Sequence, residues 1–97
     1  MIVRWTTPAS HHFAQLLAYI ANDSPAAADL VATRILTAID NLTDHPLKGH
    51  PGREGSRPSL YELVIPKTRY TAVYRLTPEV VEILALVHQS RQKPDPS

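Results

Sequence analysis

The sequence predicts one α+β domain, built from an N-terminal edge strand, an antiparallel helical hairpin and a three-stranded antiparallel meander. Two patterns lead to this fold class: apolar residues recur at helical spacing in the first half of the chain, and they alternate in the second half. We expect residues 1–97 to form a single domain, because a chain of this length can bury only one core. The sequence contains no cysteine, so hydrophobic packing has to hold this core without disulfides.

The N-terminal residues, up to about Asn22, are predicted to form the edge strand and the first helix. Residues 2–5 are rich in β-forming side chains. The segment Thr6-Thr7-Pro8 then supplies a capping hydroxyl and a proline, which is tolerated at the first position of a helix. The helix should end near Asn22, and its buried stripe consists of Phe13, Leu16, Leu17 and Ile20.

A second helix is predicted directly after the first. Ser24 and Pro25 repeat the starting signal, and the helical spacing of apolar residues continues to about Asp44. Its stripe consists of Ala28, Val31, Ile35, Ile39 and Leu42. A connection this short requires the two helices to run antiparallel.

The remaining residues are predicted to form a loop, three strands and a tail. Residues 45–58 contain all three glycines, which favours a loop over a helix or a strand. Strands are expected at residues 60–65, 69–76 and 80–88, and the last of these is apolar on both faces, as is typical of a central strand. Residues 89–97 are predicted to be a flexible C-terminal tail.

Alternation along these strands divides the predicted sheet into two faces. The more apolar face, which should cover the helices, carries Tyr61, Leu63, Ile65, Tyr70, Ala72 and Tyr74. The opposite face gathers Glu62, Arg69, Thr71 and Arg75, together with His88 if the last strand keeps a regular register. This polar face is where we expect the function of the protein.

The net charge of +1 conceals an uneven distribution of charge. Residues 1–44 carry two basic and four acidic side chains, a net of −2, whereas residues 45–97 carry eight basic and five acidic ones, a net of +3. A modest cationic surface in the second half suits a nucleic acid or an acidic protein as partner. The sequence shows neither a secretion signal nor an apolar run long enough for a membrane helix, so we expect a cytoplasmic protein.

Several short segments, taken in their order and spacing, resemble the RelE/ParE superfamily of toxins from bacterial type II toxin–antitoxin modules, and its ParE-like branch best. They are Trp5-Thr6, Ala26-Ala27-Ala28, Ile39-Asp40-Asn41-Leu42, Pro46-Leu47-Lys48-Gly49-His50-Pro51-Gly52-Arg53, Tyr61-Glu62-Leu63-Val64, Tyr70-Thr71-Ala72-Val73-Tyr74-Arg75 and Val87-His88-Gln89-Ser90-Arg91. The resemblance extends over residues 2–94 and implies the same fold that the residue patterns predict.

The resemblance also implies partners and a target. A cognate antitoxin is expected to wrap the toxin with its C-terminal segment and to form a hetero-oligomer with it. ParE-like members inhibit DNA gyrase and have a role in plasmid stabilization, whereas RelE-like members cleave messenger RNA on the ribosome.

The polar face favours the gyrase inhibitor over the ribonuclease. RelE-like cleavage needs cations that neutralise the developing charge on a phosphate. The positions that carry these cations in RelE-like enzymes correspond here to Glu62, Val64 and Thr71. A ribonuclease site would have to be rebuilt from Arg69, Arg75, His88 and Arg91, and a third possibility is a non-toxic binding module that kept the fold.

We therefore predict contacts with the target or the antitoxin rather than a catalytic site, and neither a metal nor another cofactor. The candidate contact residues are Glu62, Arg69, Arg75, His88, Arg91 and Lys93. Structural roles compete with these: Arg75 could pair with Glu62 across the hairpin, and His88 could simply end its strand. We also expect a groove between the hairpin and the edge of the sheet, which the antitoxin could fill with apolar side chains.

Overall fold

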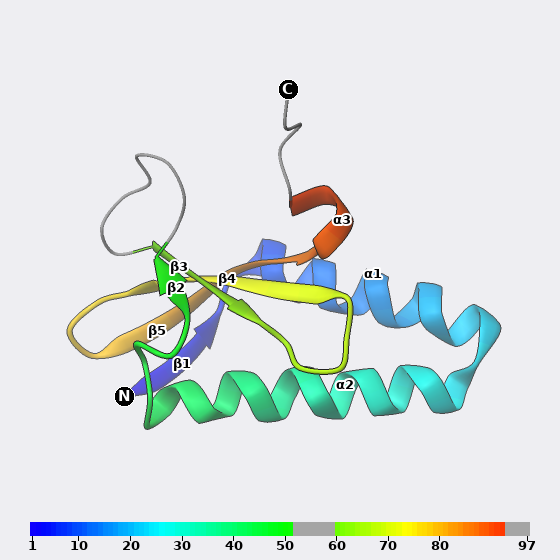
Figure 1. Ribbon diagram of the computed structural model, residues 1–97, viewed down its shortest axis with the longest axis horizontal. Coiled ribbons are helices and arrows are strands. Elements are labelled where there is room, and N and C mark those ends of the chain that lie inside the picture. The colour runs from blue at the N-terminus through cyan, green and yellow to red at the C-terminus, as the bar shows by residue number, and fades with distance from the viewer. Residues whose placement is uncertain (52–59, 93–97) are drawn as a thin grey trace.

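The computed structural model describes residues 1–51 and 60–92, which form one mixed sheet with a helical hairpin on one of its faces (Figure 1). The helices are α1 (Thr7–Asp23) and α2 (Pro25–Asp40), followed by the 3-10 turn η1 (Asn41–Thr43) and, at the C-terminal end, the helical turn α3 (Gln89–Gln92). The strands are β1 (Ile2–Trp5), β2 (His50–Pro51), β3 (Leu60–Val64), β4 (Tyr70–Leu76) and β5 (Val80–His88). Their order in the sheet is β1-β5-β4-β3-β2. The predicted fold class is confirmed.

Both long helices begin at the predicted caps. The Thr6 hydroxyl accepts a hydrogen bond from the Ala9 N–H at 3.3 Å, and the Ser24 hydroxyl accepts one from the Ala27 N–H at 3.1 Å. Such a cap satisfies one of the N–H groups that the first turn of a helix leaves without a partner. The second helix is α-helical only to Asp40, and the next residues form the 3-10 turn η1. The apolar residues at helical spacing that continue to Leu42 therefore belong to both elements. In the described parts of the chain, no helix has the length and apolarity needed to cross a bilayer.

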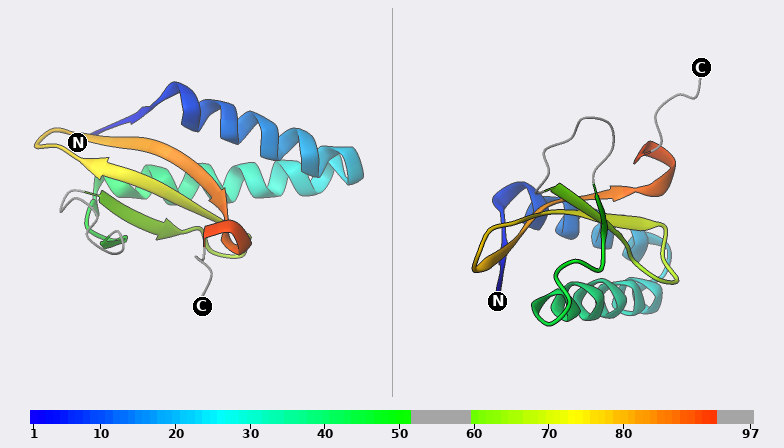
Figure 2. Two further views of the ribbon diagram at one scale, coloured as in Figure 1. Left: turned by 90° about the horizontal axis from the view of Figure 1, so that it is seen from above. Right: turned by 60° about the vertical axis from the view of Figure 1, so that its left-hand side comes forward.

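The core lies between the hairpin and the sheet (Figure 2). The helices contribute Ala9, Leu16, Ile35 and Ile39, and η1 adds Leu42; the sheet contributes Leu63, Ala72, Tyr74, Val81, Ile83 and Leu86, with Ile65 just beyond β3. Tyr61 and Tyr70 are partly buried and pack against this core. The apolar face of β3 and β4 therefore covers the helices as predicted.

The first strand of the chain lies beside the last one. β1 pairs with β5 in parallel, from Ile2 opposite Val80 to Trp5 opposite Ile83, and it forms an edge of the sheet as predicted. β5 thus lies between β1 and β4, which explains why it is apolar along almost its whole length.

A β-bulge in β5 overturns the predicted orientation of His88. Val73 lies opposite Ala85 but Tyr74 lies opposite Ile83, so Leu84 is an extra residue in β5. An extra residue reverses the alternation of side chains beyond it. His88 therefore faces the helices, opposite Tyr70, and the prediction that it shares a face with Arg75 was wrong.

Two further elements were missed. His50 and Pro51 form a short strand, with His50 opposite Glu62, within the segment that was predicted as a loop. Gln89–Gln92 form a helical turn within the predicted tail, because the Nδ1 atom of His88 accepts a hydrogen bond from the Ser90 N–H at 3.1 Å and so caps the turn. The rest of the predicted loop and tail, residues 52–59 and 93–97, lies outside the described residues.

Candidate functional site

The face of the sheet that points away from α1 and α2, here called the outer face, carries the polar residues predicted to be functional. Its register places Arg4 of β1, Glu82 of β5 and Arg75 of β4 next to one another across three strands. Glu62 and Val64 of β3 lie opposite Val73 and Thr71 of β4 on the same face.

Glu82 binds both arginines of this row. One carboxylate oxygen accepts from Nη2 of Arg4, and the other accepts from Nε of Arg75 at 3.1 Å and from its Nη2. Glu82 is 5% exposed, and a carboxylate this deeply buried needs such partners because desolvation penalises an unpaired charge. Arg75 thus pairs with Glu82, so the predicted pairing of Arg75 with Glu62 was wrong.

Among the described residues, the middle of the outer face carries no cation. Between the arginine row and the turn after β3, the described side chains on this face are Glu62 and Val64 of β3, Thr71 and Val73 of β4, and Ala85 and Val87 of β5. Thr71 is fully buried, and its hydroxyl has no hydrogen-bond partner among the described residues. The described residues in this part of the sheet thus present one carboxylate and no cation.

Three of the predicted contact residues come together at the end of β5. The Gln89 N–H donates to the Arg69 carbonyl at 2.7 Å, which holds Arg69 beside the start of α3. The His88 ring packs edge-on against Tyr70, with 5.3 Å between the ring centroids. Arg91 lies in α3, whereas Lys93 lies outside the described residues. Glu62 and Arg75 are not part of this group, because they lie in the interior of the sheet.

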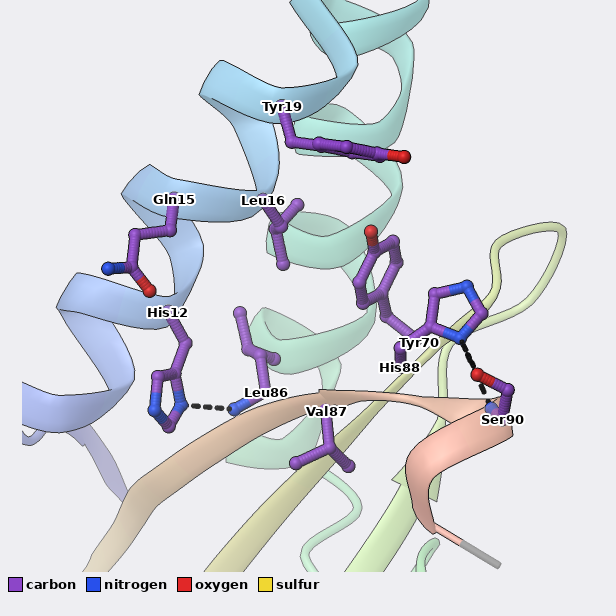
Figure 3. Close-up of a pocket in the computed structure, with 9 residues that line it drawn as sticks. All are labelled: His12, Gln15, Leu16, Tyr19, Tyr70, Leu86, Val87, His88 and Ser90. Atoms are coloured by element: carbon purple, nitrogen blue, oxygen red, sulfur yellow. Dashed lines mark hydrogen bonds between the residues drawn. The ribbon is translucent and has the colours of Figure 1, made fainter.

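A groove of about 610 Å³, here called the α1 groove, lies between α1 and the end of β5 (Figure 3). Tyr19 from α1 and Tyr70 from β4 extend into it, and His88 lies beside Tyr70. Nδ1 of His12 accepts a hydrogen bond from the Leu86 N–H at 3.2 Å, on the edge of β5 that β1 leaves uncovered. Sequence reasoning did not identify His12 or Tyr19 as groove residues, because a helical stripe predicts only the side chains that are buried.

A second groove, of about 330 Å³ and here called the α2 groove, lies between α2 and β3 with the turn that follows it. Three cations line it, Arg34, Lys48 and Lys67. The other lining residues are apolar or uncharged polar ones: Thr33, Thr37, Ala38, Asn41, Leu63, Val64 and Pro66. A groove is thus present between the hairpin and an edge of the sheet, at the place where one was predicted. Its cations were not part of that prediction.

The comparison with known families decides the identity of the fold. The family described as ParE toxin of type II toxin-antitoxin system, parDE, matches residues 3–93. The chain belongs to the ParE toxin family.

Individual relatives agree with this assignment. A protein of Sinorhizobium fredii named "Putative toxin Y4kP" is 40% identical over 92 residues, which are 95% of this chain and 92% of that protein. A solved structure described as the chromosomal ParDE TA system from P. aeruginosa superposes with a TM-score of 0.75 at 19% identity, covering 91% of this chain and 95% of the other. The structure therefore has the ParE fold, and membership of the ParDE family implies an antitoxin as partner.

Within the ParE fold, the predicted contact residues fall into two groups. Arg69, His88 and Arg91 lie at the C-terminal end of β5, next to the α1 groove, whereas Arg75 is held by Glu82. No three histidine or acidic side chains among residues 1–51 and 60–92 lie close enough together to hold a metal ion.

Proposed function

We propose that this ParE-family toxin inhibits DNA gyrase and that its cognate antitoxin neutralises it by forming a hetero-oligomer in the cytoplasm. In this proposal the chain acts as a protein inhibitor, and it needs no cofactor. The contacts with the target would come from the C-terminal end of β5, through Arg69, His88, Arg91 and Lys93.

The observation that carries the proposal is the separation of Arg75 from the other three groups of which an RNA-cleaving site would have to be rebuilt, Arg69, His88 and Arg91. A ribonuclease of the RelE type requires cations and an acid or base on one surface, around the phosphate. Here Arg75 is paired with the buried Glu82 on the outer face, while His88 faces the helices and uses Nδ1 to hold Ser90. Arg75 and His88 thus lie on opposite faces of the sheet, which favours an inhibitor over a ribonuclease that uses both.

Electrostatics support the proposed contact region. Arg69 is exposed, and so is Ser90 in α3. Arg91 and Lys93 follow His88 within five residues and would extend the positive charge of this end of the molecule. A cationic surface at this end of the sheet would favour encounter with an acidic surface of a larger protein.

A supercoiling assay tests the proposal. Purified toxin is titrated into gyrase, ATP and relaxed plasmid, and we expect a dose-dependent loss of supercoiling with accumulation of cleaved plasmid. Addition of the antitoxin should restore the activity. A type I topoisomerase acting on the same plasmid serves as the control, and it should be unaffected.

Matched variants test the contact region. Arg69→Gln and His88→Gln should weaken the inhibition of gyrase, whereas Asp23→Asn, at the far end of α1, should not. Normal supercoiling at a stoichiometric excess of folded toxin would overturn the proposal.

The two alternatives predict different results. Primer extension on messenger RNA after induction of the toxin would reveal new cleavage sites if the chain were a ribosome-dependent endoribonuclease. Unimpaired growth on expression without the antitoxin would instead indicate a binding module that has kept the fold.

A further inference from the structure

We propose that Ser90 and His88 form a nucleophilic pair that accepts an acyl group from a neutral, apolar ester bound in the α1 groove. This inference goes beyond the proposed function and does not rest on it, because it concerns the reactivity of one hydroxyl group and not the target of the toxin. Three observations carry it: the contact between the two side chains, the position of their protons, and the lining of the groove.

The Ser90 hydroxyl lies against the ring of His88 at the edge of the α1 groove (Figure 3). The distance from Oγ of Ser90 to Nδ1 of His88 is 2.8 Å, which is within reach for proton transfer from a nucleophile to its base. The His88 ring packs edge-on against Tyr70, and this contact fixes its orientation. Ser90 is exposed, so a reagent can reach its hydroxyl from solvent.

The hydrogen bonds determine which atoms carry the protons. Nδ1 of His88 lies 3.1 Å from the backbone nitrogen of Ser90, and a backbone N–H can only donate. Nδ1 is therefore unprotonated, so the Ser90 hydroxyl has to be the donor in the 2.8 Å contact. A serine that donates to the free nitrogen of a neutral imidazole has the arrangement of nucleophile and base found in serine hydrolases.

The lining of the α1 groove indicates the class of ester. The rings of Tyr19 and Tyr70 and the apolar side chains of Leu16 and Leu86 face it, and its described lining contains no lysine, arginine or carboxylate. A charged ligand would lose hydration here without gaining an ion pair. A neutral ester with an apolar acyl chain suits these walls, and the volume of about 610 Å³ is within the usual range for small-molecule sites.

The proposed step transfers the acyl group from the ester oxygen to Ser90. Oγ of Ser90 forms a bond to the carbonyl carbon while the hydroxyl proton passes to Nδ1 of His88. The bond between this carbon and the leaving oxygen then breaks, and the leaving alcohol takes the proton from Nδ1, so nothing is oxidised or reduced. While Nδ1 holds the proton it cannot accept from the Ser90 N–H, which is then free to donate to the carbonyl oxygen as negative charge develops there.

The pair lacks the third member of a triad. Nε2 of His88 makes no hydrogen bond to a described residue, and no carboxylate lies in the described lining of the groove to orient the imidazole. In a complete triad, such a carboxylate also stabilises the imidazolium that forms. We therefore expect one acylation per molecule instead of rapid turnover.

An activated ester tests the reactivity of the purified, full-length toxin. With p-nitrophenyl butyrate we expect a burst of about one equivalent of nitrophenolate, and peptide mapping should place the butyryl group on Ser90. Ser10 is the internal control, because it is exposed on α1 and its hydroxyl has no hydrogen-bond partner among the described residues. Ser90 should be acylated about 100-fold faster than Ser10. Hydroxylamine should release the group from Ser90, because it cleaves esters and leaves the amides of acylated lysines intact.

Variants separate the base from the groove. His88→Gln should slow the acylation of Ser90 to about the rate of Ser10, whereas His11→Gln, at an exposed histidine of α1, should leave it unchanged. Tyr19→Ala removes one wall of the groove at a side chain that is 80% exposed, so the fold should be kept. It should slow acylation by the butyrate ester about fivefold and acylation by the smaller acetate ester less.

The outcomes are distinguishable from those of the gyrase assay, which contains no ester. Acylation of Ser90 no faster than that of Ser10 in folded toxin, or equally fast in folded His88→Gln, would overturn the pair. Equal slowing of both esters by Tyr19→Ala would overturn the α1 groove as their binding site. The parent toxin unfolded in urea gives a test without any variant, and its two serines should react at similar rates. None of these results changes the expected loss of supercoiling.

Discussion

At the scale of single residues, Tyr74 links the sheet to the segment that leads into β2. Its hydroxyl donates to the Pro46 carbonyl at 2.7 Å and accepts from the Gly49 N–H at 3.0 Å, and the side chain is fully buried. A Cβ on Gly49 would lie 2.6 Å from this hydroxyl and 2.8 Å from the Glu62 carbonyl, so only glycine allows the chain to pass here. Gly49 therefore has a packing role, not a phosphate-binding one.

Tyr74→Phe should destabilise the fold at neutral pH, because it leaves the buried Gly49 N–H and the partly buried Pro46 C=O without their partner. We expect the free energy of unfolding to fall by about 1–3 kcal/mol, measured by urea denaturation. Tyr19→Phe is the matched control, because Tyr19 is 80% exposed, and its free energy of unfolding should stay within about 0.5 kcal/mol of the parent value.

The same variant should change the response to alkaline pH. Burial raises the pKa of Tyr74 above its ordinary value of 10.0, with the hydrogen bond from Gly49 acting in the opposite direction. The folded state therefore keeps this proton at pH values where the unfolded chain has lost it, and the stabilisation, complete below pH 10, is lost as pH rises through the folded pKa. A pH series of urea denaturations should show a shallower alkaline loss of stability for Tyr74→Phe than for the parent protein. Equal slopes would contradict this account.

At the scale of elements, Glu82 connects three strands. It lies on β5 and binds Arg4 of β1 and Arg75 of β4, whose side chains are 66% and 38% exposed. Because both arginines are partly solvated, the interaction is weaker than that of a fully buried ion pair. Removal of the Glu82 carboxylate nevertheless leaves the guanidinium groups of Arg4 and Arg75 facing each other across β5.

Glu82→Gln should therefore loosen β1, which is held to the sheet by a single neighbouring strand. We expect a loss of about 1–2 kcal/mol in the free energy of unfolding and faster hydrogen exchange of the β1 amides. Glu79→Gln is the control, because Glu79 is exposed in the turn before β5. If the β1 amides of Glu82→Gln exchange as slowly as those of the parent protein, backbone pairing alone holds this strand.

The helices, the main strands and their buried face could be predicted from the sequence because each follows from a local period or a cap. Ser24 with Pro25, for example, marks the boundary between α1 and α2 without reference to any other element. The orientation of His88 could not be predicted, because the bulge at Leu84 leaves no mark in an apolar strand and appears only when β4 and β5 are paired. The partner of Arg75 was missed for a related reason, since a carboxylate within an apolar strand gives no local sign of which neighbouring strand holds its counterions.

The candidate site was predicted less completely than the fold. Alternation correctly directed Glu62 and Arg75 away from the helices, because they lie on β3 and β4, whose pairing is regular, and the extra residue lies in β5. Grooves depend on how helices pack against the sheet, so Tyr19 and Lys67 acquire their positions only from tertiary structure. Charge patterning indicated a cationic second half but could not show that Arg34, from the acidic first half, joins Lys48 and Lys67.

At the scale of the whole molecule, a domain of 97 residues has a small core, and partner binding should contribute strongly to its stability. A ligand that binds only the folded state at 100 times its Kd adds about 2.7 kcal/mol to the free energy of unfolding. For a domain of this size that corresponds to a rise in Tm of roughly 10 °C or more.

Thermal unfolding with increasing antitoxin should show this rise, and the rise should continue with antitoxin concentration beyond saturation. The control is an unrelated protein at the same concentration, which should leave Tm unchanged. A Tm that stays constant while calorimetry reports binding would mean that the antitoxin also binds the unfolded toxin.

The parallel pairing of β1 with β5 has a consequence for how the protein is made. Ile2 and Val80 are neighbours in the sheet, so β1 has no place to dock until β5 has been synthesised. A nascent toxin is thus kept from completing its fold during its own synthesis, and an antitoxin present in the cell can meet it as it emerges. A translation product that stops before residue 80 would lack the strand on which both sides of the sheet depend, and should be degraded by proteases.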